Sequence, residues 1–230
     1  PGAMEGLKEA RELFSTVLGI KPEETIVGNN ASLMMLVNIL QWAFIRGLKN
    51  SSKPWIYSEK PKMIVTVPGY DRHFRLLNEL GFEMVQVKMT GNGPDMDEVE
   101  KIAGGDEKVK GILFVPTYSN PTGESISDDN VKRLASMKTK AADFTVFGDD
   151  AYAVHHLTDE KKRPLNLLRA CESAGNPERA YLFGSTSKIT FSGAGLGFMG
   201  CSTENIKFLS KYLGAQWIGP NKIEQYRHVK

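Results

Sequence analysis

The chain has 230 residues, of which 41% are hydrophobic and 24% are charged, the balance of an ordinary globular protein rather than a disordered or collagen-like one. A formal net charge of +2, with no run of five or six basic residues, predicts no nucleic-acid partner and no binding to a membrane surface. Two cysteines, Cys171 and Cys201, are too few for a disulfide framework or a structural zinc site. The most apolar stretch, residues 33–45, is too short to span a bilayer, and no secretory signal is present. These features predict a cytoplasmic protein.

Helical and extended patterns alternate along the chain. Apolar residues at helical spacing predict helices over residues 7–18, 33–47, 74–80, 95–103, 127–135, 164–174 and 204–213. Short apolar runs predict strands over residues 25–27, 63–67, 84–89, 111–116, 144–147 and 180–183, and the glycine-rich stretch 195–202 also looks strand-like. The polar stretch 50–61 is predicted to be a surface loop. The alternation predicts an α/β fold with three αβα layers, in which helices cover both faces of a mostly parallel sheet.

The two ends of the chain carry information of their own. It opens on Pro1-Gly2-Ala3 without an initiator methionine, and it closes inside a helical-looking segment, residues 225–230. We therefore expect residues 1–230 to be one large domain of a longer protein.

Five polar clusters follow predicted strands, and ligands of open α/β sheets bind at the carboxyl ends of the strands. The clusters are Gly-Asn-Asn-Ala-Ser (28–32), Pro-Gly-Tyr-Asp-Arg-His (68–73), Asn-Pro-Thr-Gly (120–123), Asp-Asp-Ala-Tyr (149–152) and Ser-Thr-Ser-Lys (185–188). Together and in this order they resemble the aspartate aminotransferase family of pyridoxal-phosphate enzymes of fold type I, from residue 28 to about residue 200. The resemblance implies the cofactor-binding large domain of a homodimeric transaminase that acts on an amino acid and a 2-oxo acid.

The chemistry of pyridoxal phosphate gives these clusters expected roles. The cofactor aldehyde needs an amine, and Lys188 matches the Schiff-base lysine that also moves the proton at the substrate carbon. Asp149 matches the carboxylate that keeps the pyridine nitrogen protonated, and the spacing to Tyr152 favours it over Asp150. Tyr152 and Asn120 match the residues that hydrogen-bond the phenolic oxygen of the ring.

A phosphate group needs backbone N–H groups and a helix N-terminus. Asn30, Ala31 and Ser32 open the long second helix, so their amides are expected to face the phosphate. Ser185 and Ser187 match the hydroxyl donors that the family directs to the same group.

Two aromatic residues complete the resemblance. Tyr70 matches the ring that stacks on the cofactor, and His73 matches a histidine that supports the carboxylate of Asp149. One departure stands out, because typical members carry an arginine about eight residues beyond the lysine and no arginine lies between Lys188 and Lys207. The chain therefore resembles the MocR-like, or type Ic, branch, for which aspartate or glutamate is the implied amino donor.

Several motifs of the chain also suggest other functions. Residues 195–200 match the Gly-x-Gly-x-x-Gly dinucleotide fingerprint, but they look strand-like and no acidic residue follows at the required spacing. The pair His155-His156 suggests a metal site, yet neighbours on a strand point to opposite faces and make a poor chelate. Two alternatives stay open because they share the cofactor residues: a β- or C–S lyase, and the effector domain of a pyridoxal-phosphate-binding transcriptional regulator.

Overall fold

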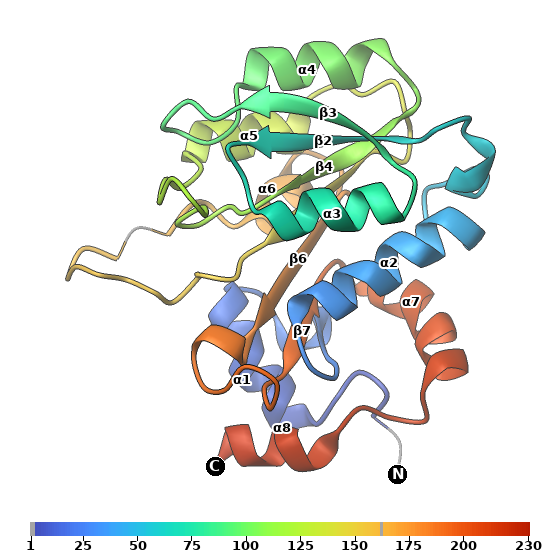
Figure 1. Cartoon of the computed structure of the whole chain (residues 1–230). Helices are drawn as coiled ribbons and strands as arrows, with labels where there is room; N and C mark the ends of the chain where they lie inside the picture. The colour runs from blue at the N-terminus through green and yellow to red at the C-terminus, as the bar shows by residue number, and fades with distance from the viewer. Residues whose placement is uncertain (1–2, 162) are drawn as a thin grey trace.

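One seven-stranded sheet forms the centre of the computed structural model, which describes residues 3–161 and 163–230 (Figure 1). Pro1 and Gly2, on which the expectation about the start of the chain rests, lie outside these ranges. The strands are β1 (Thr25–Val27), β2 (Lys62–Val67), β3 (Glu83–Lys88), β4 (Val109–Phe114), β5 (Thr145–Asp149), β6 (Ala180–Ser185) and β7 (Gly197–Gly200). Their order is β1-β7-β6-β5-β4-β2-β3, and only β7 runs antiparallel to its neighbours. The predicted α/β fold with a mostly parallel sheet is confirmed.

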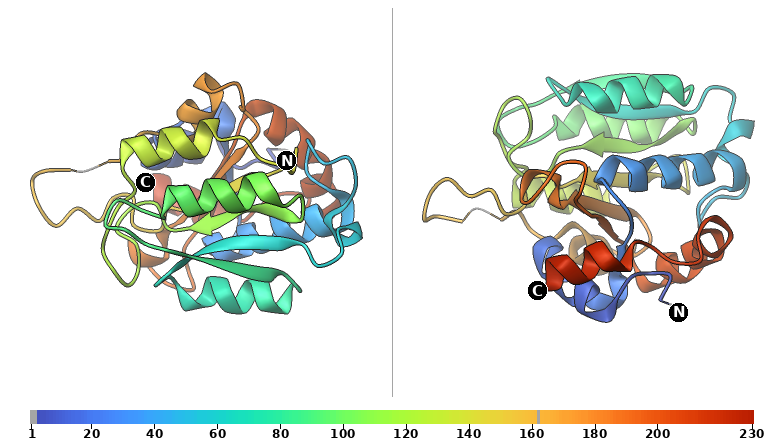
Figure 2. Two further views of the ribbon diagram at one scale, coloured as in Figure 1. Left: turned by 90° about the horizontal axis from the view of Figure 1, so that it is seen from above. Right: turned by 60° about the horizontal axis from the view of Figure 1, so that its bottom comes forward.

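Helices cover both faces of this sheet, as Figures 1 and 2 show. They are α1 (Lys8–Leu18), α2 (Ser32–Arg46), α3 (Asp71–Glu79), α4 (Met96–Gly105), α5 (Asp128–Ser136), α6 (Leu167–Ser173), α7 (Thr203–Gln216) and α8 (Lys222–Val229). Apolar residues of α1, α4, α5 and α6 pack into the core on one face, and those of α2, α3 and α7 into the core on the other. Helix α8 packs against α1 near the C-terminus. The two cores give the three αβα layers that the sequence predicts.

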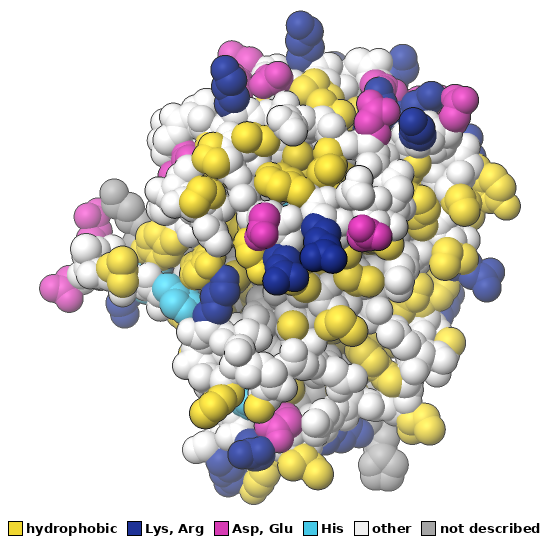
Figure 3. Space-filling view, in the orientation of Figure 1, with side chains coloured by type: hydrophobic (Ala, Val, Ile, Leu, Met, Phe, Trp, Pro, Cys, Tyr) yellow, Lys and Arg dark blue, Asp and Glu magenta, His cyan; other side chains and the backbone are white. Residues whose placement is uncertain are grey.

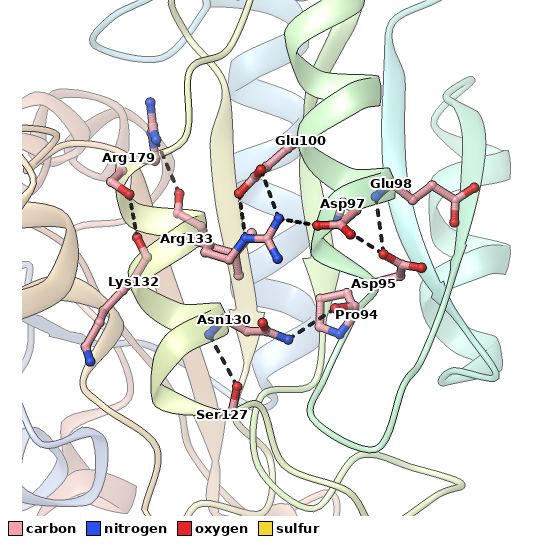
Figure 4. Close-up of polar contacts among 12 residues, drawn as sticks. Pro94, Asp95, Asp97, Glu98, Glu100, Ser127, Asn130, Lys132, Arg133 and Arg179 are labelled. Atoms are coloured by element: carbon pink, nitrogen blue, oxygen red, sulfur yellow. Dashed lines mark hydrogen bonds and ion pairs between the residues drawn. The ribbon is translucent and has the colours of Figure 1, made fainter.

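Local sequence signals fix several helix ends. Gly19 ends α1 in a left-handed conformation with φ 67°, which glycine adopts without strain. The side chain of Asp95 accepts hydrogen bonds from the first turn of α4, and the side chain of Ser127 accepts one from the amide of Asn130 in α5. Figure 4 shows these caps and the guanidinium of Arg133 between the two helices.

Arg133 joins α5 to α4 through two carboxylates. Its guanidinium lies 2.6 Å from Asp97 and 2.8 Å from Glu100, with both nitrogen–oxygen contacts to Glu100 in a forked geometry. Because the group is partly exposed, we assign this network the modest stabilisation of a surface ion pair, about 0–1 kcal/mol per contact.

The stretch 50–61 is not the plain surface loop that its polar composition predicts. It contains a short 3₁₀ helix, Trp55–Tyr57, and the indole of Trp55 is completely buried. The indole Nε1 of Trp55 donates to Asp143 at 2.8 Å, and Lys110 pairs with the other oxygen of this carboxylate at 3.1 Å. The large apolar area of one tryptophan therefore anchors a segment that is otherwise polar.

Three further expectations are corrected. The helix predicted over 164–174 begins only at Leu167, where the side chain of Asn166 caps it by accepting from the amide of Arg169. His155 and His156 do not lie on a strand, since β5 ends at Asp149 and residues 151–154 form a turn. The strand-like stretch 195–202 forms a strand only over Gly197–Gly200.

Charges of both signs are interspersed with hydrophobic side chains on the face drawn in Figure 3. In residues 3–161 and 163–230, no helix is long and apolar enough to cross a membrane.

Candidate active site

The strand-end clusters come together around one cavity of about 140 Å³. Its walls come from the residues that follow the carboxyl ends of β2, β4, β5 and β6 and from the start of α2. Nine of the ten predicted site residues line it: Ala31, Ser32, Tyr70, Asn120, Asp149, Tyr152, Ser185, Ser187 and Lys188. Asn30 is not among the residues that line it, and its side-chain amide instead donates to the carbonyl of Gly195 at 3.4 Å. Leu33, Val115 and Ala151 also line the cavity, and no polar signal in the sequence marked them.

The floor of the cavity carries a buried acid. Asp149 is the last residue of β5, its side chain is 4% exposed, and its Oδ2 lies 2.9 Å from Nε2 of His73 at the start of α3. The imidazole is equally buried, and the ring of Tyr70 meets it edge-on at 5.1 Å. The second carboxylate oxygen, Oδ1, is buried and has no partner among the described residues. A buried carboxylate oxygen without a donor is unfavourable, so this atom marks the place of a missing N–H or O–H group.

Asp150, the alternative to Asp149 that the sequence offers for the carboxylate, lines a different cavity. Successive side chains of a strand point to opposite faces, and Asp150 lines a second hollow of about 130 Å³ on the side of α5 and α6. Burial raises its pKa to about 6, and the negative charge of Asp149 contributes in the same direction. Asp149 lines the cavity that holds Lys188, whereas Asp150 is absent from its lining.

Lys188 lines the same cavity as this acid and ends a short 3₁₀ helix (Thr186–Lys188) that follows β6. Its amine donates to the phenolic oxygen of Tyr152 at 2.5 Å and lies 4.0 Å from the centre of that ring. The ring of Tyr70 is 5.5 Å from the same amine. The lysine is nevertheless exposed, so the described residues hold its amine by contacts and do not desolvate it.

The other end of the cavity is built from backbone and hydroxyl groups. Ala31, with φ 72°, precedes the first turn of α2, and Ser32 begins the helix. Gly197 of β7 passes directly beneath this segment, with its amide bonded to the carbonyl of Asn29 at 2.6 Å. β7 also pairs with β6 so that Gly197 faces Ser185. The glycine run that resembled a dinucleotide fingerprint therefore serves close backbone approach at this corner of the site.

Lys188 is the one basic side chain among the residues that line the cavity, and none of them is an arginine. The helix N-terminus of α2 and the hydroxyls of Ser185 and Ser187 are the remaining groups suited to an anion.

Comparisons with known proteins identify the family of the chain. The family model described as aspartate amino-transferase matches residues 1–230. The chain belongs to the aspartate aminotransferase family. It is 43% identical over 229 residues to an aspartate aminotransferase of Corynebacterium glutamicum, covering 100% of this chain and 53% of that protein. A crystal structure of an aspartate transaminase from the same organism superposes with a TM-score of 0.96 at 43% identity, covering 99% of this chain and 54% of that one.

The chain thus spans about half the length of the relatives that it matches. A helix-turn-helix transcriptional regulator of Bacillus subtilis is 31% identical over 91 residues, which is 40% of this chain and 20% of the regulator. Family likeness to the regulators is therefore shorter than the likeness to the aminotransferases, which runs over the whole chain.

Proposed function

We propose that residues 1–230 form the cofactor-binding large domain of a pyridoxal-phosphate-dependent aminotransferase. The observation that carries the proposal is the pairing of two groups in one cavity: the amine of Lys188, held by Tyr152, and the partnerless buried oxygen of Asp149. A lysine amine suits the aldehyde of the cofactor, and a carboxylate suits a protonated pyridine nitrogen.

The rest of the cavity fits the same group. Tyr152 and Asn120 line the cavity and would donate to the phenolic oxygen of the cofactor, and the Tyr70 ring would cover one face of the planar heterocycle. The amides at the start of α2, together with Ser185 and Ser187, would hold the phosphate. No arginine lines the cavity to share in this binding. Asn30 contributes through the backbone of its segment, since its side chain is bonded to Gly195.

When bound, pyridoxal phosphate supplies an electron sink that stabilises negative charge at the α-carbon of an amino acid. The task of Asp149 is to hold a proton on the ring nitrogen, because a buried carboxylate next to a cation favours the charged form of its partner. His73 keeps the carboxylate in place through the 2.9 Å contact to Oδ2 and leaves Oδ1 free for the ring. Lys188 holds and returns the proton at the substrate carbon, and Tyr152 fixes the position from which its amine acts.

The likeness to aspartate aminotransferases supports aspartate or glutamate as the amino donor and a 2-oxo acid as the acceptor. We assign the chain to the type Ic branch on the missing arginine, and we infer that the whole protein acts as a homodimer in the cytoplasm. The residues that grip the substrate carboxylate are expected outside the cavity lining described above, which holds no arginine.

The deciding experiment uses the full-length protein loaded with pyridoxal phosphate and given aspartate with 2-oxoglutarate. Formation of glutamate in proportion to loss of aspartate is expected, with no product in the absence of the 2-oxo acid beyond a single half-reaction. Release of ammonium or of a thiol from an amino acid without any acceptor would contradict the proposal and favour a lyase. Binding of the cofactor without turnover of any amino acid would favour a regulatory domain.

A further inference from the structure

His155 contacts the two residues that define the reactive end of the cavity. It follows Tyr152 in the turn after β5, and its backbone amide donates to the Tyr152 carbonyl at 3.0 Å. Its ring meets the Tyr152 ring edge-on, with 5.5 Å between the centroids. Its Nε2 lies 3.1 Å from the backbone carbonyl oxygen of Lys188. Each of the three residues therefore contacts the other two, because the amine of Lys188 donates to the hydroxyl of Tyr152.

The direction of the His155 hydrogen bond follows from its partner. A backbone carbonyl can only accept, so Nε2 must carry the hydrogen and donate it to Lys188. The other ring nitrogen, Nδ1, is buried and has no partner among the described residues. Among the described residues, the ring of His155 therefore makes one hydrogen bond, and its acceptor is the backbone carbonyl of Lys188.

The segment that carries Lys188 depends on such outside contacts. Thr186 is buried and is fixed by reciprocal hydrogen bonds with Leu196, one through its amide and one through its hydroxyl. Beyond it the chain emerges, and Ile189 is 46% exposed. The amides of residues 189 and 190 bond only back to Thr186, within the same turn. Nε2 of His228 lies 3.1 Å from the hydroxyls of Thr186 and Thr190, on either side of Lys188. The contact from His155 is the one that ties the peptide of Lys188 itself to the loop that holds Tyr152.

We propose that His155 is a positioning residue for Lys188: by holding the lysine carbonyl and packing on the Tyr152 ring, it keeps the amine at the tyrosine hydroxyl. The inference rests on the proposed function only for the task that Lys188 performs. The positioning itself is a property of the polypeptide and is testable without cofactor.

The neighbouring histidine provides a matched control. Nδ1 of His156 lies 2.9 Å from the hydroxyl of Tyr118, and the two rings meet edge-on at 5.8 Å. His156 therefore also makes one ring hydrogen bond and one edge-on aromatic contact, but both go to Tyr118, whereas those of His155 go to the Lys188 carbonyl and the Tyr152 ring.

The experiment measures how fast Lys188 reacts with an amine-acylating reagent in the full-length protein freed of cofactor, at one pH, with peptides quantified by mass spectrometry. His155→Phe keeps a ring against Tyr152 but removes the donor, whereas His155→Gln keeps an N–H donor at a similar reach. Because an amine held at the Tyr152 hydroxyl and against its ring can be reached by a reagent from fewer directions, loosening this contact should speed acylation. We expect a two- to ten-fold faster reaction in His155→Phe, about the effect of one net hydrogen bond.

His155→Gln should stay near the parent rate, and His156→Phe should match the parent at Lys188. Equal rates in His155→Phe and the parent would overturn the proposal, as would equal acceleration in His155→Phe and His156→Phe, which would indicate general loosening. If the phenylalanine variant does not fold, an unchanged rate in a folded His155→Ala would overturn the proposal in the same way. Cofactor binding and turnover are separate measurements, so a failure of the proposed function would leave this result readable.

Discussion

Gly197→Ala tests whether close backbone approach builds the anion end of the cavity. A Cβ placed on Gly197 would lie 2.5 Å from the carbonyl oxygen of Ala31 and 2.7 Å from its carbonyl carbon. Both are backbone atoms, and real Cβ contacts essentially never fall below 3.0 Å, so the Ala31 segment or β7 has to move. The segment is tied to the same strand by the Asn29 and Gly28 hydrogen bonds, which leaves little room to relax.

The expected cost follows from this overlap. Added methyl groups in close-packed surroundings destabilise by about 1–3 kcal/mol. For a domain of this size each kcal/mol lowers Tm by about 2–4 °C, so the variant should melt about 2–12 °C below the parent. The displaced segment carries the amides at the start of α2, so affinity for pyridoxal phosphate should fall as well.

Melting by calorimetry and titration of the cofactor by absorbance measure the two effects. Gly104→Ala in α4 is the control, because its Cβ would meet only the carbonyl of Lys138 at an ordinary 3.6 Å. Alanine also favours a helix, so this variant should equal or slightly exceed the parent in stability. The reasoning is refuted if Gly197→Ala melts within about 1 °C of the parent and binds the cofactor with the parent's affinity.

Four further outcomes are expected. Borohydride reduction of the loaded protein should fix the cofactor on the peptide that contains Lys188, and a label found elsewhere would disprove that assignment. Asp149→Asn should lower turnover by about 100-fold or more while cofactor binding stays measurable, whereas Asp150→Asn should stay within a few-fold; the reverse order would exchange their roles. The pKa of Asp150 is raised to about 6, so its contribution to stability is fully present below its unfolded pKa and is lost as pH rises through 6. The free energy of unfolding of the parent in urea, relative to that of Asp150→Asn, should therefore fall between pH 4 and 7. Trp55→Ala should cost about 3–5 kcal/mol in the free energy of unfolding, and a loss below 1 kcal/mol would show that residues 50–61 do not depend on the indole.

Most of the fold could be predicted because its signals are local. Buried parallel strands appear as continuous apolar runs, such as residues 63–65 in β2, and helices show their core-facing spacing, such as Leu36 and Leu40 in α2. The errors occurred where one long-range contact outweighed composition. Trp55 makes a core element of a polar stretch, because the partner that satisfies its indole, Asp143, lies 88 residues away.

For the candidate site, the sequence determined the inventory of chemical groups. The order of the strand-end clusters carried the family resemblance that singled out Lys188, Asp149, Tyr152 and Tyr70. All four line one cavity, because residues at the carboxyl ends of neighbouring parallel strands meet at one edge of the sheet. The same reasoning placed Asn30 in the site through its backbone amide, but Asn30 does not line the cavity, and its side chain instead donates to the carbonyl of Gly195, 165 residues away.

Apart from the contact of His73 with Asp149, which the resemblance implies, tertiary structure decided which groups face one another. The strand order brings β5 between β4 and β6, so that Asp149 lines the cavity of Lys188 while Asp150 enters a separate cavity. The turn after β5 likewise brings His155 to the Lys188 carbonyl, 33 residues further along the chain. Residue types and strand ends can be recognised from short stretches of sequence. The pairing of side chains depends on how segments far apart in the sequence pack together, and no short stretch contains that information.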